Sequence, residues 1–268
     1  MPGKDQSRIR MDKDIDVVVG VLIYRQGAYV IDKFLANQVE IQRAYPGSEL
    51  VFAVNEADFV EELKQLIDSC GVKGKVILYE TVRPHYVKSR VWNVTCGRES
   101  LRKYILSQTQ AKYFLSLDAD MIYEPDIVKI LENEIQGYDI VFSGCPLRDY
   151  GVGLAGAGCV MISRSILEKI RFRCIEFKNG DVMFEDNLLE LDSFRLRSRI
   201  KRGFFLHVSH YRSANEARDI EPHRVSLYQA ITTSMLVRYL LIRASLIVKR
   251  NIPWRLKVIA DKLRGDVW

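Results

Sequence analysis

The sequence has few of the features that mark a secreted, disulfide-bonded or zinc-binding protein. Its five cysteines are odd in number, scattered and without a CxxC pair. That usage argues against a disulfide framework or a zinc knuckle and favours a reducing compartment. No apolar run near the amino terminus resembles a signal peptide, and we expect the polar residues 1–14 to be disordered. Internal repeats and low-complexity linkers are also missing, so 268 residues predict one large domain or two small ones.

A phosphate-cradling loop is another missing feature. The glycine-rich stretch GVGLAGAG, residues 151–158, lacks the Lys and Ser/Thr of a P-loop and precedes a predicted strand instead of a helix. We therefore expect its glycines to allow close backbone approach to a ligand or to a neighbouring strand.

Positive charge is concentrated at the carboxyl-terminal end. Residues 238–268 contain eight Lys or Arg and two Asp, a net charge of +6 that equals the formal charge of the whole chain. The rest of the protein is therefore close to neutral. A tail of this kind favours an anionic surface, either a membrane or a nucleic acid.

The same tail has the pattern of an amphipathic helix. Apolar residues recur every three or four positions from Val225, and residues 227–248 are long enough to span a bilayer. Arg238 and Arg243 would each cost about 2.5–3.5 kcal/mol near the membrane centre. We therefore predict a helix lying flat as an interfacial anchor, with Trp254 nearby. The alternative is a helix packed on the protein's own core.

Strands alternate with helices along most of the chain. The expected strands are residues 16–23, 49–54, 75–79, 113–117, 139–143, 159–163 and 204–208. The expected helices are residues 28–45, 59–70, 97–108, 125–135 and 184–202. This order predicts an α/β domain over residues 15–215, with a mostly parallel sheet flanked by helices, and a basic helical segment over residues 216–268.

The sequence YFLSLDADMIYEP, residues 113–125, contains the strongest site pattern. An apolar run stops abruptly at Asp118 and Asp120. Such a run predicts a strand buried on both faces, and the carboxyl end of such a strand is where open α/β sheets bind ligands. A divalent cation held between carboxylates and phosphate oxygens, Mn²⁺ or Mg²⁺, would relieve the repulsion between two acids this close. The competing interpretation is a solvated loop.

Three further groups of polar residues have two interpretations each. Glu185 and Asp186 begin a predicted helix, where acids stabilise the helix end, but an acid there can also act as a general base. His207 and His210 point to opposite faces of an extended strand, so one of them at most joins Asp118 or Asp120 at a metal. Arg90 and Asn93 precede a helix and either reach a diphosphate or lie on the surface.

Taken in order, these features resemble glycosyltransferase family 2 and its relatives with the GT-A fold. The resemblance covers residues 16–210, about three quarters of the chain. It rests on DVVVGVLIYR, the DAD motif, GAGCVMISRSILEKIRF and FEDNLLELDSFRLRSRIKRGFFLHVSH. It implies a GT-A-like fold and transfer of a sugar from a nucleotide-diphosphate donor.

The resemblance assigns the donor nucleotide to the ends of the first two strands. Tyr24 and Arg25 occupy the first of these places, and Asn55 with Glu56 the second. The family usually has an Asp at that second place. Arg90 and Asn93 match the polar segment ahead of the DxD helix.

The resemblance also assigns the reacting groups. Asp118 and Asp120 match the metal–diphosphate motif, and His210 matches a histidine that closes on the metal. Asp186 matches the catalytic base, with Glu185 as its neighbour. The implied reaction is metal-dependent and inverts the anomeric centre.

Two competing functions belong to other classes. A sugar-phosphate nucleotidyltransferase would carry GxGTRxxxxxPK after the first strand, where this chain has YRQGAYVIDK. A basic adaptor for a membrane or a nucleic acid would instead leave the acids Asp118, Asp120, Glu185 and Asp186 without a role.

We expect a cytoplasmic enzyme that is peripheral at the inner face of the membrane. Its expected acceptor is a glycan or a lipid-linked molecule, and no nucleic-acid partner is expected.

Overall fold

The computed structural model describes residues 15–81, 91–147, 152–154, 156–176 and 182–226, together with Val237 and Leu240. The chain divides into two compact units, Met1–Val225 and Ser226–Trp268. No helix among the described residues is long and apolar enough to cross a membrane. Arg90 and most of the predicted amphipathic helix lie outside the described residues, and the fold below is that of the first unit.

A mostly parallel sheet forms the centre of the unit, as predicted. In the described part of the chain it has seven strands, in the order β12 (Ile200–Gly203), β6 (Ile140–Ser143), β9 (Cys159–Ser163), β4 (Tyr113–Asp118), β1 (Val17–Leu22), β2 (Ser48–Val54) and β3 (Gly74–Leu78). β9 runs antiparallel to β4 and β6, whereas the other neighbouring pairs are parallel.

The composition of β1 explains its central position. Its sequence VVVGVL is rich in β-branched residues, which favour the pleated conformation, and it contains no charge. Val17, Val19 and Val21 pack into one hydrophobic core, and Val18 packs into the other. A strand with apolar side chains on both faces is stable only when helices cover both faces of the sheet.

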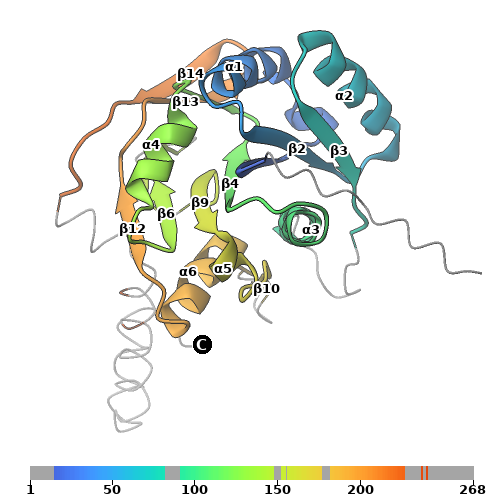
Figure 1. The fold of residues 1–268 in the computed structure, drawn as a ribbon. Helices are drawn as coiled ribbons and strands as arrows, with labels where there is room; N and C mark the ends of the chain where they lie inside the picture. Colours follow the sequence, from blue (N-terminus) through green and yellow to red (C-terminus); the bar gives the residue numbers. More distant parts are fainter. Residues whose placement is uncertain are drawn as a thin grey trace, which may run out of the picture. The chain divides into compact units, whose positions relative to one another are not determined.

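Helices cover both faces of the sheet (Figure 1). On one side, α1 (Ile31–Ala44), α2 (Ala57–Cys70) and α4 (Ile127–Glu134) supply the apolar residues of the first core. On the other side, α3 (Val91–Gln108), α5 (Arg164–Leu167) and α6 (Glu185–Arg195) supply those of the second. α2 ends at Gly71 in the left-handed conformation, φ 68°, which confirms the predicted stop.

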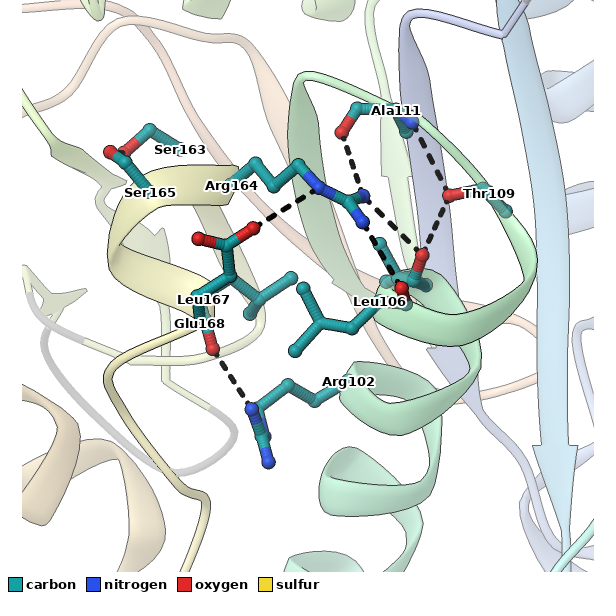
Figure 2. A network of polar contacts seen from close by, with 10 residues as sticks. Arg102, Leu106, Thr109, Ala111, Ser163, Arg164, Ser165, Leu167 and Glu168 are labelled. Atoms are coloured by element: carbon teal, nitrogen blue, oxygen red, sulfur yellow. Dashed lines mark hydrogen bonds and ion pairs between the residues drawn. The ribbon is translucent and has the colours of Figure 1, made fainter. Parts of the chain in front are cut away.

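Two arginines fasten α5 to the end of α3 (Figure 2). The Arg164 guanidinium donates to the Leu106 carbonyl at 3.1 Å, where the last carbonyls of α3 lack helical partners. Arg102 donates from α3 to the Leu167 carbonyl at 3.0 Å. These bonds fix α3, which carries residues of the candidate site, to the short helix that follows β9.

In the part of the chain that the structure describes, three small sheets accompany the central one. β5 (Met121–Tyr123), β13 (Val208–Ser213) and β14 (Glu216–Ile220) form an antiparallel sheet in the order β14-β13-β5. β7 (Cys145–Pro146) pairs with β8 (Val152–Gly153), and β10 (Ile175–Glu176) pairs with β11 (Val182–Met183). The β5–β13 pairing joins the segment after the DAD strand to the last part of the unit.

The helix expected over residues 184–202 is too long. α6 ends at Arg195, where the Ser198 amide donates back to the Ser193 carbonyl at 2.9 Å. Ile200–Gly203 then forms β12, because the open backbone of β6 pairs with it. Tertiary pairing therefore overrides the helical pattern.

Two further boundaries differ from the prediction. The strand expected over residues 204–208 begins only at Val208 and continues to Ser213. Residues 216–220, expected in the helical segment, form β14, because the short turn at Ala214 and Asn215 returns the chain along β13 as a hairpin. The domain boundary predicted at residue 215 therefore falls inside a hairpin.

Candidate active site

The two aspartates of the DAD sequence lie where the central strand ends. β4 closes with Asp118, and a turn through Ala119 leads to Asp120 and β5. Asp120 is buried, whereas the Asp118 side chain keeps 38% of its surface exposed. Both carboxylates therefore stand at the carboxyl edge of the parallel strands, the edge that binds ligands in open α/β sheets.

His210 lies beside Asp120. Its Nε2 is 3.5 Å from Asp120 Oδ2, and its Nδ1 is 2.6 Å from the Pro146 carbonyl oxygen. Because a carbonyl oxygen only accepts, Nδ1 carries a hydrogen, and Nε2 faces the carboxylate. Tyr29 donates its hydroxyl to the Tyr211 carbonyl at 2.9 Å and lies 3.4 Å from Asp120 Oδ2.

The strand pairing explains why His210 and not His207 reaches the site. His210 pairs with Met121 in the β13–β5 ladder, directly after Asp120. His207 precedes the strand, and its Nδ1 is 2.8 Å from a carboxylate oxygen of Glu221. One histidine at most was expected at the metal, and the described geometry brings only His210 next to the DAD acids.

The surroundings of His210 favour its protonated form. Burial by itself lowers the pKa of His210. Hydrogen bonds with Asp120 and with the Pro146 carbonyl, together with the negative charges of Asp120 and Asp118, raise the pKa by more than burial lowers it. The net pKa of His210 therefore lies above its ordinary value. The acids at this edge thus attract a positive charge, which either a proton or a bound cation supplies.

Arg98, which the sequence analysis did not single out, links the DAD strand to the acidic start of α6. Its guanidinium Nη2 lies 3.1 Å from Asp118 Oδ1, and Nη1 is hydrogen-bonded to Glu185 Oε1. The Arg98 and Glu185 side chains are only 7% and 4% exposed. Glu185 is thus an ion-pair partner that orients Arg98, while Arg98 Nε and Glu185 Oε2 are buried without a hydrogen-bond partner among the described residues.

The spacing of α3 contains the signal that identifies Arg98. Its buried positions recur every three or four residues, through Thr95, Arg98, Leu101 and Ile105. A charged residue on the core-facing stripe of a helix requires a buried partner. The expected helix started at Gly97, whereas α3 starts at Val91, which places Asn93 in its first turn.

Asp186 follows Glu185 in the first turn of α6. Phe184 is the residue before the helix, so neither acid is the N-cap, and the Asn187 amide donates to Asp186 Oδ1 at 2.6 Å. Burial is the largest influence on the pKa of Asp186, and it raises that pKa. The positive charge of Arg98 and the hydrogen bond from the Asn187 amide lower the pKa, whereas the negative charge of Asp118 raises it. The net pKa of Asp186 lies above its ordinary value. A carboxylate with a raised pKa is a stronger proton acceptor than an ordinary one.

The structure brings only some of the predicted nucleotide-binding groups together. The Arg25 amide donates to Glu56 Oε2 at 2.7 Å, which joins the ends of β1 and β2. The Arg25 guanidinium turns away to α2, where it pairs with Asp58 at 3.4 Å and with Glu62. Asn55 Oδ1 is buried without a hydrogen-bond partner among the described residues, so it offers an acceptor.

Tyr79 connects two other predicted donor residues. Its hydroxyl lies 3.4 Å from the Tyr24 hydroxyl and donates to the Asn93 carbonyl at 3.1 Å. Burial, with the nearby Tyr24 hydroxyl, raises the pKa of Tyr79 well above its ordinary value. Tyr79 follows β3 directly, so three strand ends and the start of α3 converge at this point.

The glycine-rich stretch has the role that its lack of a P-loop pattern predicted. A Cβ at Gly158 would lie 2.6 Å from Asp118 Oδ2, which is closer than real Cβ contacts permit. The Gly158 carbonyl accepts from the Tyr123 hydroxyl at 2.6 Å and from the Asp118 amide at 3.1 Å. The Asp118 carboxylate therefore packs directly against Gly158, where only a residue without a side chain fits.

Asp120 and His210 are the described residues that could contribute ligands to a cation. No three His, Cys, Asp or Glu side chains of the described residues converge closely enough to hold an ion by themselves. Asp120 supplies carboxylate oxygens, and His210 Nε2 lies next to them. A diphosphate supplies the remaining oxygens at sites of this kind, where one or two protein groups suffice.

Comparisons with known proteins give structural likenesses only. A scan of protein-family models and a search of curated proteins find no match. The mannosyltransferase PcManGT from Pyrobaculum calidifontis, solved with GDP-Man and Mn²⁺, has TM-score 0.50 and 14% identity over 69% of this chain and 54% of its own. S. aureus TarS 1–349, solved with UDP, has TM-score 0.50 and 16% identity over 69% of this chain and 57% of its own. The inositol-1-phosphate CTP transferase from T. maritima has TM-score 0.47, 10% identity and coverages of 70% and 84%.

The likenesses to PcManGT and to TarS 1–349, each with TM-score 0.50, establish the fold. The chain spans little more than half the length of PcManGT and of TarS 1–349. At such low identity the arrangement of strands and helices is shared, whereas substrates are not thereby assigned. The central sheet, with β9 antiparallel beside β4, agrees with that arrangement. The chain is therefore an α/β protein with a GT-A-like fold.

Proposed function

We propose that this protein is a metal-dependent, inverting glycosyltransferase that moves a sugar from a nucleotide-diphosphate donor to an acceptor hydroxyl. The observation that carries the proposal is that the acids at one edge of the sheet form two separate groups. Asp120 with His210 forms a place for positive charge, and Asp186 is a separate carboxylate with a raised pKa. Binding a charged leaving group and accepting a proton are the two tasks of this reaction.

Asp120 and His210 are the groups that would hold the cation. When bound, the cation supplies Lewis-acid stabilisation of the diphosphate. A nitrogen neighbour suits Mn²⁺ better than Mg²⁺, which prefers oxygen ligands and water. We infer that Mn²⁺ is the better cofactor. Asp118, oriented by Arg98 and Gly158, completes the donor side of the site.

Asp186 accepts the proton in our proposal. The acceptor O–H bond breaks, its proton passes to the Asp186 carboxylate, and the oxygen forms a bond to the anomeric carbon. The bond from that carbon to the diphosphate oxygen breaks on the opposite side, so the centre inverts and the nucleoside diphosphate leaves. Glu185 stays paired with Arg98 and positions this end of α6.

The donor class is supported by what the similar proteins bind. PcManGT was solved with GDP-Man and Mn²⁺, and TarS with UDP. In this chain, Tyr24, Asn55 and Asn93 lie at the ends of the strands and helix where a nucleotide would sit. The Arg25 side chain, held by α2, has a structural role in this proposal.

We further propose a glycan or lipid-linked acceptor and a position at the cytoplasmic face of a membrane. The support is the charge of residues 238–268, eight bases against two acids, which favours an anionic surface. Binding to a membrane does not by itself determine the acceptor, because a peripheral enzyme can also act on soluble molecules.

Thermal unfolding with nucleotide-sugars tests the proposal. Ligand at 100 times its Kd stabilises a protein by about 2.7 kcal/mol. For a protein of this size that raises Tm by roughly 5–10 °C. We expect one nucleotide class to give such a shift in the presence of Mn²⁺, and we expect Asp120→Asn to abolish it.

The matched control is Asp126→Asn. Asp126 is an exposed aspartate paired with Lys129 on the surface, and the substitution changes the charge by the same amount as Asp120→Asn. The control should respond to the donor like the wild type. If no nucleotide-sugar shifts Tm with any metal, the transferase proposal fails; pyrophosphate release from a nucleoside triphosphate and a sugar phosphate would indicate a nucleotidyltransferase instead.

A further inference from the structure

The turn between α6 and β12 forms an exposed surface that is both apolar and cationic. Phe194 and Leu196 are 55% and 42% exposed, which is unusual for side chains of this size in a folded domain. Residues 194–202, reading FRLRSRIKR, contain five basic residues and no acid. The Asp139 amide donates to the Arg199 carbonyl at 2.8 Å, and this places Tyr138, which is 39% exposed, next to the turn.

We name this surface the α6–β12 patch. It consists of the exposed residues Tyr138, Phe194, Arg195, Leu196, Arg197 and Arg199. The patch lies where β6 and β12 begin, since Ile140 pairs with Ile200 as the first rung of their ladder. α6 and β12 adjoin at one end of the sheet in Figure 1.

The backbone at Arg197 is unfavourable for the residue that occupies it. Arg197 has φ 55°, the only non-glycine residue with a positive φ in the described part of the chain. It occupies the position after a helix end where glycine is usual, with its amide donating to the Phe194 carbonyl at 3.0 Å. An arginine here costs backbone stability that glycine would not cost. The strained backbone turns a long cation outward beside Phe194 and Leu196.

Charge complementarity selects the partner. Arg195 and Arg197 form no ion pair with an acid among the described residues, and Arg199 is 3.6 Å from Asp139. The second unit, Ser226–Trp268, has eight bases and two acids, so it carries the same sign as the patch. A second copy of the chain would present the same cations. The occupant is therefore an anionic molecule.

We propose that the α6–β12 patch binds the anionic face of a lipid bilayer. Phe194 and Leu196 would insert among the lipid chains at the headgroup boundary, and the arginines would remain with the lipid phosphates. Tyr138 is of the type that concentrates at this interface. Leucine has no flat face for stacking on bases, so the pair Phe194 and Leu196 favours lipid over single-stranded nucleic acid.

This contact is distinct from the active site. α6 begins at Glu185, next to Asp118 through Arg98, and ends at Arg195. Eleven helical residues span about 16 Å. Docking through the patch would thus leave the carboxyl edge of the sheet open to donor and acceptor. The inference does not depend on the proposed function, because vesicle binding is measured without turnover.

Arg197→Gly is the most informative variant. It removes one cation and relieves the positive φ, so its Tm should be unchanged or higher, and weaker binding would not reflect unfolding. With the full chain and vesicles of 30% phosphatidylglycerol in phosphatidylcholine, we expect sedimentation to show about fivefold weaker binding. Leu196→Ser should also weaken vesicle binding while leaving retention by a single-stranded oligonucleotide unchanged.

Arg43→Gln is the matched control. Arg43 is exposed on α1, and its substitution removes the same charge while the basic tail stays constant in every variant. Vesicle binding should be close to wild type. Equal vesicle binding by Arg197→Gly and Arg43→Gln would overturn the proposal. A Leu196→Ser variant that binds vesicles like the wild type, or that loses the oligonucleotide instead, would overturn it as well.

Discussion

Replacing Arg98 by methionine removes the cation that pairs with both Asp118 and Glu185. The substitution keeps an unbranched apolar stem of similar length but leaves Glu185 without its ion-pair partner. Arg98 and Glu185 are 7% and 4% exposed, so the remaining carboxylate has little access to water. Breaking a buried pair by removing one partner costs about 3–5 kcal/mol. We expect Arg98→Met to lose that much of the free energy of unfolding at pH 8.

The origin of this loss can be separated from lost packing. If an uncompensated charge is the cause, the loss relative to wild type should shrink as the pH falls, because a proton then neutralises Glu185. The double variant Arg98→Met/Glu185→Gln removes both charges and should recover most of the stability. Replacing a buried ion pair by neutral groups of similar volume is often close to neutral.

Urea unfolding of the wild type, Arg98→Met, Glu185→Gln and the double variant at pH 8 and pH 5.5 gives the coupling free energy between the two side chains. We expect a coupling of at least 2 kcal/mol at pH 8 and a smaller value at pH 5.5. Refutation is straightforward. A loss below 1 kcal/mol for Arg98→Met, or no recovery in the double variant, would show that this ion pair does not hold α6 to the DAD strand.

Three further predictions concern the candidate active site. Asp186→Asn should lower the transfer rate by about 10²–10⁴-fold while nucleotide-sugar binding is kept, and loss of binding instead would contradict its role as base. Because only the ionised form accepts a proton and its pKa is raised, wild-type kcat should fall as the pH drops through a value above the ordinary pKa of about 3.9; a flat profile down to that pH would argue against it. Gly158→Ala should cost about 1–3 kcal/mol and weaken donor binding, since its Cβ would lie 2.6 Å from Asp118 Oδ2; calorimetry showing wild-type affinity would contradict this.

The sequence predicted the central sheet well because its strands carry their own pattern. Three of its strands, β1, β2 and β4, are buried on both faces, and uninterrupted apolar runs in the sequence are typical of such strands. The DAD acids interrupt such a run, so their place at a strand end also followed from pattern. Gly71 and the glycine-rich stretch were predictable for the same reason, since their conformational freedom has a local use.

The errors share a different cause. β12 reads as helix because its basic and apolar residues have helical spacing, yet the open edge of β6 pairs with it. The Arg98 network joins α3, β4 and α6, and no local pattern reveals a contact between residues 87 positions apart. The Arg25 side chain, predicted at the donor, pairs with two acids of α2, Asp58 and Glu62, and the sequence pattern did not indicate these partners. Long-range partners decided each of these cases.

The most direct test of the central claim is donor turnover measured with matched variants. The protein is incubated with each nucleotide-sugar and Mn²⁺, and released nucleoside diphosphate is quantified for the wild type, Asp120→Asn and Asp126→Asn. We predict release from one nucleotide class by the wild type and by Asp126→Asn, none by Asp120→Asn, and strong reduction when Mn²⁺ is chelated. Equal release by all three proteins, or none from any donor, would contradict the assignment of this sheet edge as a glycosyltransferase active site.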